Sequence, residues 1–113
     1  MSDFLYIYRG GTNPSERTPE EMQKTMQRWT AWLKELGDKG HLKDLGNPLE
    51  RTGKVVKGRE KTVTDGPFAE AKDLVGGYSL VITKDLAQAA ELAKGCPIFD
   101  AGGFVEVRPI MKM

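Results

Sequence analysis

Two carboxylates and an ammonium group gather in one short stretch of the chain, where Asp65, Glu70 and Lys72 follow one another closely. Residues 65–68, Asp-Gly-Pro-Phe, have the composition of a tight turn. If the chain folds back there, the three side chains line one pocket, where Asp65 acts as a general base or anchors a cationic or hydroxylated ligand. The structural alternative is that Asp65 accepts N–H bonds within its own turn while Glu70 and Lys72 lie in water.

His41 is the second acid–base candidate, because it is the only histidine and its unperturbed pKa is about 6.5. It follows Gly40 at the expected end of a helix. A protonated imidazole is stabilised there by the helix dipole without any catalytic role, so both interpretations stay open.

Glu106 and Arg108 lie two residues apart and share one face of the expected last strand. They predict either a ligand site, in which the guanidinium binds a carboxylate or phosphate, or a structural ion pair. In the ligand-site interpretation, the hydroxyls of Tyr6, Tyr8 and Tyr78 reach the same space, although aromatic residues at strand spacing more often pack in the core.

Other kinds of site find no support in the sequence. No His, Cys and carboxylate cluster has metal-ligand spacing, and the glycine pairs form no nucleotide-binding fingerprint, so we expect neither a metal nor a cofactor. The 17 basic and 16 acidic residues give a net charge of +1, which offers no attraction for nucleic acid or an anionic membrane. Cys96 is the only cysteine, and no signal peptide or membrane span is evident, so we expect a soluble cytoplasmic protein.

The elements that must position these residues follow from periodicity and capping signals. Thr18, Pro19 and Glu21 have the types and spacing of a helix start. The expected order is a strand at 4–8, a helix from 19 to about 39, an irregular strand at 42–49, a hairpin at 54–64, a strand at 78–83, a second helix capped by Asp85 and ended by 95–97, and a strand at 104–110.

This order predicts an α+β fold, a ferredoxin-like βαββαβ arrangement with an inserted β-hairpin, in one domain over residues 1–113. Both helices then cover one face of the sheet. The first strand is apolar on both sides, and Tyr78, Leu80 and Ile82 add a further apolar face. Because a soluble monomer rarely exposes so large a patch, we expect a homodimer with two sheets packed face to face.

Two motifs point to a family. Residues 63–72 read Val-Thr-Asp-Gly-Pro-Phe-Ala-Glu-Ala-Lys, and residues 103–110 read Gly-Phe-Val-Glu-Val-Arg-Pro-Ile. With these motifs the chain resembles the YCII-related family, in the branch named for its Asp-Gly-Pro-Phe motif. The resemblance implies a dimeric α/β-barrel on a ferredoxin-like fold. Related members pair a helix-borne histidine with an aspartate and are proposed to be enzymes, whereas the position that we match to that histidine carries Trp29.

We therefore expect a dimer that binds a small molecule in a cleft near residues 65–68, with catalysis left open. Asp65 and His41 are the candidate catalytic residues; Glu70, Lys72, Tyr78, Glu106 and Arg108 are the candidate ligand-binding residues. Two alternatives remain. One is a regulatory module, because some relatives of the resembled family occur beside or fused to extracytoplasmic-function sigma factors. The other is a purely structural dimer.

Overall fold

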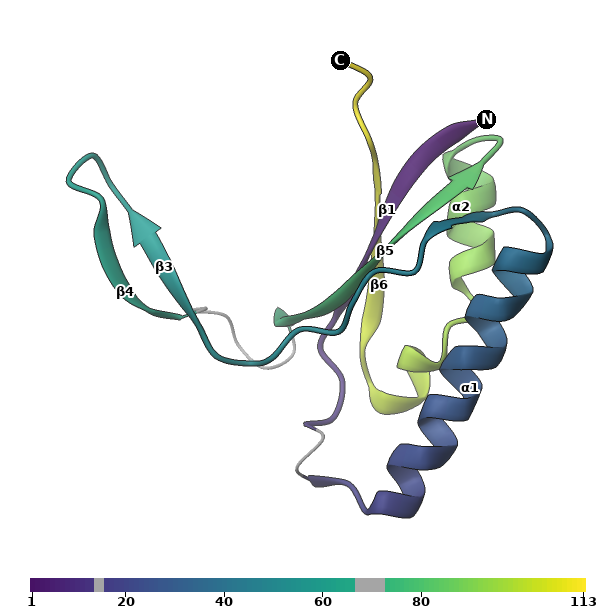
Figure 1. Cartoon of the computed structure of the whole chain (residues 1–113), viewed down its shortest axis with the longest axis horizontal. Helices are drawn as coiled ribbons and strands as arrows, with labels where there is room; N and C mark the ends of the chain where they lie inside the picture. The colour runs from purple at the N-terminus through teal and green to yellow at the C-terminus, as the bar shows by residue number, and fades with distance from the viewer. Residues whose placement is uncertain (14–15, 67–72) are drawn as a thin grey trace.

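A four-stranded antiparallel sheet forms the centre of the protein, which a computed structural model describes over residues 1–13, 16–66 and 73–113 (Figure 1). The elements are β1 (Ser2–Arg9), α1 (Pro19–Asp38), β2 (Leu42–Asp44), β3 (Gly53–Lys57), β4 (Thr62–Gly66), β5 (Val75–Thr83), α2 (Leu86–Ala93), η3 (Pro97–Ala101) and β6 (Phe104–Pro109). The sheet order is β2-β5-β1-β6, and β3 and β4 form a separate two-stranded sheet. This is the ferredoxin-like topology with an inserted hairpin, so the expected fold class is confirmed.

Helix α1 begins where its capping residues predict. The Thr18 hydroxyl accepts a hydrogen bond from the Glu21 backbone N–H at 3.1 Å, and Pro19 occupies the first turn. Only the second half of α1 reaches the core, where Trp32 and Leu36 are buried. In α2, the Asp85 carboxylate accepts from the Gln88 N–H at 2.8 Å. Within the described residues, neither helix is long and apolar enough to cross a membrane.

The core lies between the sheet and the two helices, which lie on the same side of it (Figure 1). Phe4, Tyr6 and Tyr8 of β1 point into this core and are 4%, 0% and 7% exposed. The Tyr6 hydroxyl donates to the Ala89 carbonyl at 2.5 Å, and the Tyr8 hydroxyl donates to Ser79 Oγ at 2.8 Å. Each buried phenol therefore has a partner, as burial of a polar group requires.

The expectation that Tyr6, Tyr8 and Tyr78 share one space is wrong. In the β1–β5 pair, Tyr78 lies opposite Ile7, and directly opposed residues point to the same face of a sheet. Tyr78 therefore projects with Ile7, away from the helices, while Tyr6 and Tyr8 project toward them. Period-two alternation separates the two faces of a strand but does not say which face the helices cover.

The other side of the sheet carries a half-buried apolar surface that we call the open face. It consists of Leu5, Ile7, Tyr78, Leu80 and Ile82. Leu5 lies opposite Leu80, and Ile7 lies opposite Tyr78, so the side chains form one continuous patch. Neither α1 nor α2 covers this side of the sheet (Figure 1).

We call the β3–β4 hairpin, residues 53–66, the arm, because it projects from the body of the protein, which consists of the four-stranded sheet and its helices (Figure 1). Its strands pair in register, with Val56 opposite Val63 and Lys54 opposite Asp65. The expectation of a turn at residues 65–68 is thus wrong for its first half, because Asp65 and Gly66 are the last residues of strand β4. The other half, Pro67 and Phe68, lies outside the described residues.

Candidate functional site

Three ionic side chains meet at the β6 edge of the open face and form what we call the charged cluster: Arg9, Glu106 and Arg108. Arg9 Nε donates to Glu106 Oε1 at 2.7 Å, and Arg108 Nη1 donates to Glu106 Oε2 at 3.2 Å. Arg9 also donates from Nη1 to the Asp73 carbonyl at 2.9 Å. The carboxylate thus bridges two guanidinium groups.

Strand register explains why the cluster lies on the open face. In the β1–β6 pair, Ile7 lies opposite Glu106 and Leu5 lies opposite Arg108. Since opposed residues share a face, both ionic residues of β6 project on the same side as the apolar residues of β1. The β6 residues that alternate with them, Val105 and Val107, pack against the core instead.

The charged cluster has an excess of one positive charge. Its two guanidinium groups hold the pKa of the Glu106 carboxyl below its usual value of 4.5, chiefly through the hydrogen bond from Arg9 and next through that from Arg108. The Arg108 side chain is 65% exposed. Among described side chains it donates only from Nη1 to Glu106, so most of its guanidinium edge faces solvent. This edge is suited to binding an oxyanion.

A cavity of about 490 Å³ lies beside the charged cluster and shares Arg9 with it. Its described lining consists of Arg9 and Val75 from the sheet, Leu49, Glu50 and Thr52 from the segment before β3, and Asp73 and Leu74 before β5. Three of these residues are aliphatic and three are ionisable. The cavity therefore combines apolar walls with a few polar groups, as small-molecule sites usually do.

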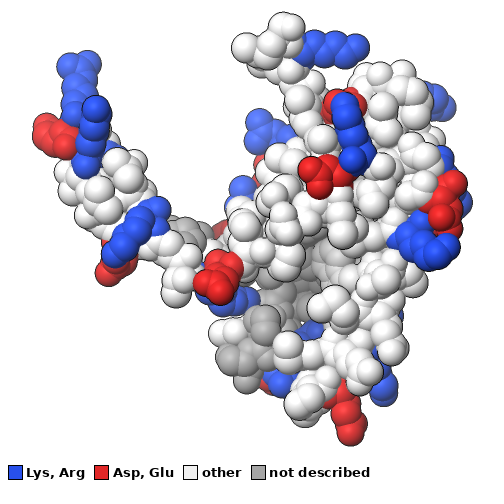
Figure 2. Space-filling view, in the orientation of Figure 1, with Lys and Arg blue, Asp and Glu red and all other residues white. Residues whose placement is uncertain are grey.

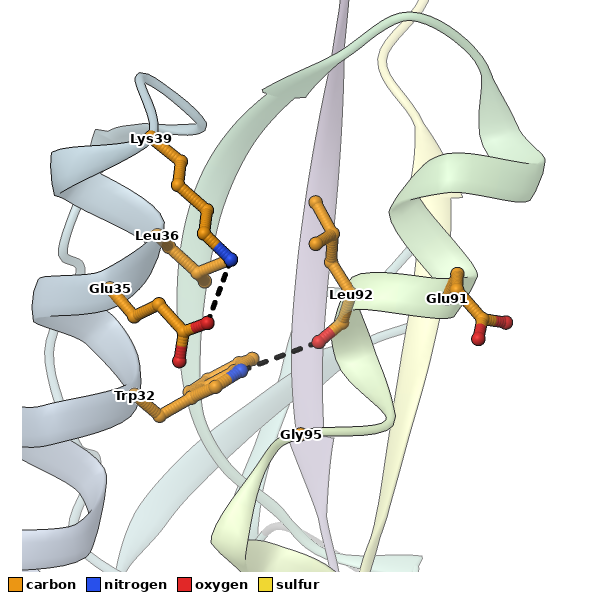
Figure 3. A pocket seen from close by; sticks show the side chains of 7 residues that line it. All are labelled: Trp32, Glu35, Leu36, Lys39, Glu91, Leu92 and Gly95. Atoms are coloured by element: carbon orange, nitrogen blue, oxygen red, sulfur yellow. Dashed lines mark hydrogen bonds and ion pairs between the residues drawn. The ribbon is translucent and has the colours of Figure 1, made fainter.

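A smaller cavity of about 170 Å³ lies between α1 and α2 (Figure 3). Its polar groups are already paired: Trp32 Nε1 donates to the Leu92 carbonyl at 3.3 Å, and Lys39 Nζ donates to Glu35 Oε1 at 2.8 Å. The Glu91 carboxylate points away from it (Figure 3). We interpret this cavity as a packing gap between the helices.

The two candidate catalytic residues lie on different elements. Asp65 is on the arm, where its side chain is 89% exposed and its Oδ1 accepts from Lys54 Nζ at 2.5 Å. His41 follows α1, and its Nδ1 lies 3.0 Å from the Ile82 carbonyl. No hydrogen bond joins Asp65, His41 or Arg108 to one another in the described part of the chain. Their catalytic roles stay predictions.

Of the candidate ligand-binding residues, the structure brings Glu106 and Arg108 into contact and places Tyr78 on the same open face. The Tyr78 hydroxyl accepts from Asn47 Nδ2 at 3.3 Å. Glu70 and Lys72 lie outside the described residues. In the described ranges, no group of three or more His, Cys, Asp or Glu residues is arranged to hold a metal ion.

Sequence reasoning missed Arg9 as a site residue. The available signal was a cation directly after an apolar strand, two residues beyond Ile7 and hence on the same face. Its partner, Glu106, is 97 residues away in the sequence, so only strand register reveals the contact.

Cys96 is a poor nucleophile, because burial raises the pKa of its thiol to about 12.

Similarity to known protein families identifies the family of the chain. The family model for the YCII-related domain matches residues 5–113. The chain belongs to the YCII-related family. Its assignment to the branch of this family that is named for the Asp-Gly-Pro-Phe motif stays a prediction. No curated protein matches its sequence.

A solved structure also resembles this YCII-related domain. It is 5-chloro-2-hydroxyhydroquinone dehydrochlorinase (TftG) from Burkholderia phenoliruptrix AC1100, in complex with 2,5-dihydroxybenzoquinone. The alignment has a TM-score of 0.49 and 16% sequence identity, and it covers 98% of this chain and 95% of the dehydrochlorinase. At this similarity, the activity and ligand named for that protein remain statements about that protein alone.

Proposed function

We propose that this YCII-related domain is a homodimer that binds a small organic anion beside the charged cluster. The observation that carries the proposal is the charged cluster: its Arg9 lines a cavity of about 490 Å³, and its Glu106 joins Arg9 to the exposed guanidinium of Arg108. A cavity of this volume accommodates a compact organic molecule.

The aliphatic part of the lining argues for a ligand with an apolar body, and the exposed guanidinium of Arg108 argues for one anionic group. Leu49, Leu74 and Val75 offer aliphatic contact, which favours a ring or short hydrocarbon part. Glu106 neutralises only one of the two guanidinium groups, so a monoanion completes the charge balance of the cluster; Glu50 and Asp73 line the cavity beside Arg9, so the anionic group is expected at Arg108. A guanidinium binds a carboxylate through two parallel hydrogen bonds when its geometry allows, which makes a carboxylate the best first probe.

Homodimerisation is supported by the surface that one protomer leaves exposed. The chain has an accessible surface of 8014 Å², whereas a compact monomer of this mass exposes about 6,200 Å². The excess is about twice the 800 Å² that each partner buries in an interface of standard size. The half-buried open face is a continuous apolar part of that surface, so a second copy packed on it would cover apolar side chains and reduce the excess.

Binding, and not a particular reaction, is what the cavity supports. Its described ionisable groups are Arg9, Glu50 and Asp73, and its described lining contains no histidine, cysteine or serine. Two carboxylates beside a guanidinium can position a polar group of the ligand.

The test is isothermal titration calorimetry with benzoate, which combines a ring with a carboxylate. We expect benzoate to bind and neutral benzamide, of the same shape, to bind at least about tenfold more weakly, because it lacks the charge-assisted contact. Arg108→Ala should weaken benzoate binding by a similar factor. Arg59→Ala, which removes an exposed arginine from the tip of the arm, is the matched control and should leave the affinity unchanged.

Equal binding of benzoate and benzamide would overturn the anionic part of the proposal. An Arg108→Ala affinity equal to that of the wild type would overturn the site. The dimer is tested separately by sedimentation velocity over a dilution series, and a monomer at micromolar concentration would overturn it.

A further inference from the structure

The arm leaves the body on the side of the sheet opposite to the helices, which is the side of the open face (Figure 1). Its two strands hydrogen-bond to each other and not to the four-stranded sheet. In the space-filling view, a broad concavity separates the arm from the rest of the protein (Figure 2). The chain has a radius of gyration of 15.5 Å, whereas a compact domain of this length has about 13 Å. One copy is therefore more extended than a compact domain.

One face of the arm is apolar at its centre. Val56 and Val63 lie directly opposite each other and are 63% and 60% exposed. The Lys54–Asp65 ion pair lies on the same face, two residues along each strand from the valine pair and away from the tip of the arm. Charged side chains gather toward the tip of the arm, with uncharged atoms below them (Figure 2). An isolated two-stranded hairpin is at best marginally stable in water, and an exposed valine pair leaves most of its apolar area in contact with water until something covers it.

We propose that the arm is a clasp, which packs its Val56–Val63 face against a second copy of this chain. The inference rests on the proposed homodimer. In a twofold pair with the open faces together, the partner's sheet lies in the concavity between the open face and the arm. Each arm then reaches past its own protomer and covers the partner, and the twofold axis makes the two contacts identical.

The occupant of the concavity is a second copy because shape, area and contact chemistry agree. The excess surface of one protomer is larger than the roughly 800 Å² that each partner buries in an interface of standard size, so covering both the open face and the arm is compatible with the area. Both surfaces are aliphatic at their centres and ionic at their margins, as the core and rim of an interface are. The two-stranded arm also gains an apolar surface to pack against, whereas the described part of its own chain leaves Val56 and Val63 exposed.

The first test compares dimer dissociation constants by sedimentation velocity. In the double variant Val56→Asp with Val63→Asp, two charges replace the valine pair, and we expect the dissociation constant to rise at least about tenfold, because each dimer would bury four carboxylates. Lys57→Asp is the control. It changes the net charge by the same two units, but Lys57 is one residue from Val56 and so lies on the opposite face of the arm. We expect its dissociation constant to stay within twofold of the wild type.

The second test detects the contact directly and does not depend on dimer affinity. A photo-crosslinking p-benzoylphenylalanine is placed at position 56 or, as the control, at position 57. Irradiation of purified protein should give covalent dimers from position 56 and far fewer from position 57. Circular dichroism confirms that each variant keeps the fold, since the arm lies outside the core.

The outcomes separate the clasp from the dimer. A wild-type dimer that the valine variant weakens, with crosslinking at position 56, supports the clasp. A wild-type dimer of unchanged affinity in the valine variant, without crosslinks at position 56, overturns the clasp and leaves the homodimer standing. A monomeric wild type overturns both.

Discussion

Arg9 Nε donates a hydrogen bond of 2.7 Å to Glu106 Oε1, although the two residues are not directly opposed in the sheet. Arg9 lies opposite Phe104, and Glu106 lies opposite Ile7, so the ion pair runs diagonally between neighbouring strands. The diagonal leaves Glu106 Oε2 available to Arg108. One carboxylate thereby fixes two guanidinium groups at the edge of the open face.

The first prediction concerns acid stability. The folded pKa of Glu106 lies below 4.5, so its carboxylate stabilises the fold above that pH, and this contribution is lost as the pH falls through the folded value. The stability difference between the wild type and Glu106→Gln should therefore be largest at neutral pH and shrink between pH 5 and pH 3. Urea unfolding at several pH values measures it, with Glu60→Gln from the arm as the control. A difference that does not change with pH would contradict the prediction.

The second prediction concerns alkaline stability. Burial raises the pKa of Tyr6 from 10.0 to about 12, so its protonated form stabilises the fold below pH 10 and this contribution is lost as the pH rises toward 12. We expect Tyr6→Phe to cost about 1 kcal/mol at pH 7, because it removes the hydrogen bond to the Ala89 carbonyl. Above pH 10 the gap between the two proteins should close, which urea unfolding at pH 8, 10 and 11 checks. A gap of constant size would show that Tyr6 titrates alike in the folded and unfolded states.

The third prediction compares two glycines with the same backbone conformation. Gly46 has φ +72°, and a Cβ there would lie 1.8 Å from the Tyr78 carbonyl oxygen. Gly40 has φ +79° with nothing within 4 Å of such a Cβ. Gly40→Ala should cost about 1 kcal/mol, from the left-handed conformation alone. Gly46→Ala should cost more than about 3 kcal/mol, because the backbone must also move.

Thermal unfolding of the two glycine variants provides the measurement. If they lose equal stability, then the loop after β2 does not lie against Tyr78 as closely as the structure shows.

The fourth prediction concerns His41. The Ile82 carbonyl can only accept, so Nδ1 of His41 carries the proton in their 3.0 Å contact. His41→Ala should cost about 1 kcal/mol for this bond and leave benzoate affinity within twofold of the wild type, as measured by calorimetry. A tenfold loss of benzoate affinity with the fold intact would instead place His41 in the ligand site.

Much of the fold could be predicted from the sequence because its signals are local. Thr18, Pro19 and Glu21 fix the start of α1 through contacts within four residues, and the hairpin strands differ from the expected hairpin by one or two residues at each end. The strand–helix order then leaves few ways to arrange one antiparallel sheet. The apolar excess on both sides of β1 also indicated an uncovered sheet face.

The candidate site could be predicted only in part, because it depends on strand register. Glu106 and Arg108 share a face by period-two alternation alone, whereas the contact of Glu106 with Arg9 needs the alignment of β1 with β6. The prediction for Asp65 failed because a local signal was misleading. Its Gly-Pro neighbours suggest a turn, but pairing with Lys54 continues the strand through Gly66. Tertiary pairing overrides turn composition at this position.

The place of β1 in the sheet has a consequence for synthesis of the chain. β1 is translated before both of its neighbours, and its second neighbour, β6, begins only at Phe104. At about 5 to 20 residues per second, the ribosome needs about 5 to 20 seconds to supply it. Throughout that interval β1, an apolar strand, has at least one unpaired edge, which is open to pairing with a neighbouring polypeptide.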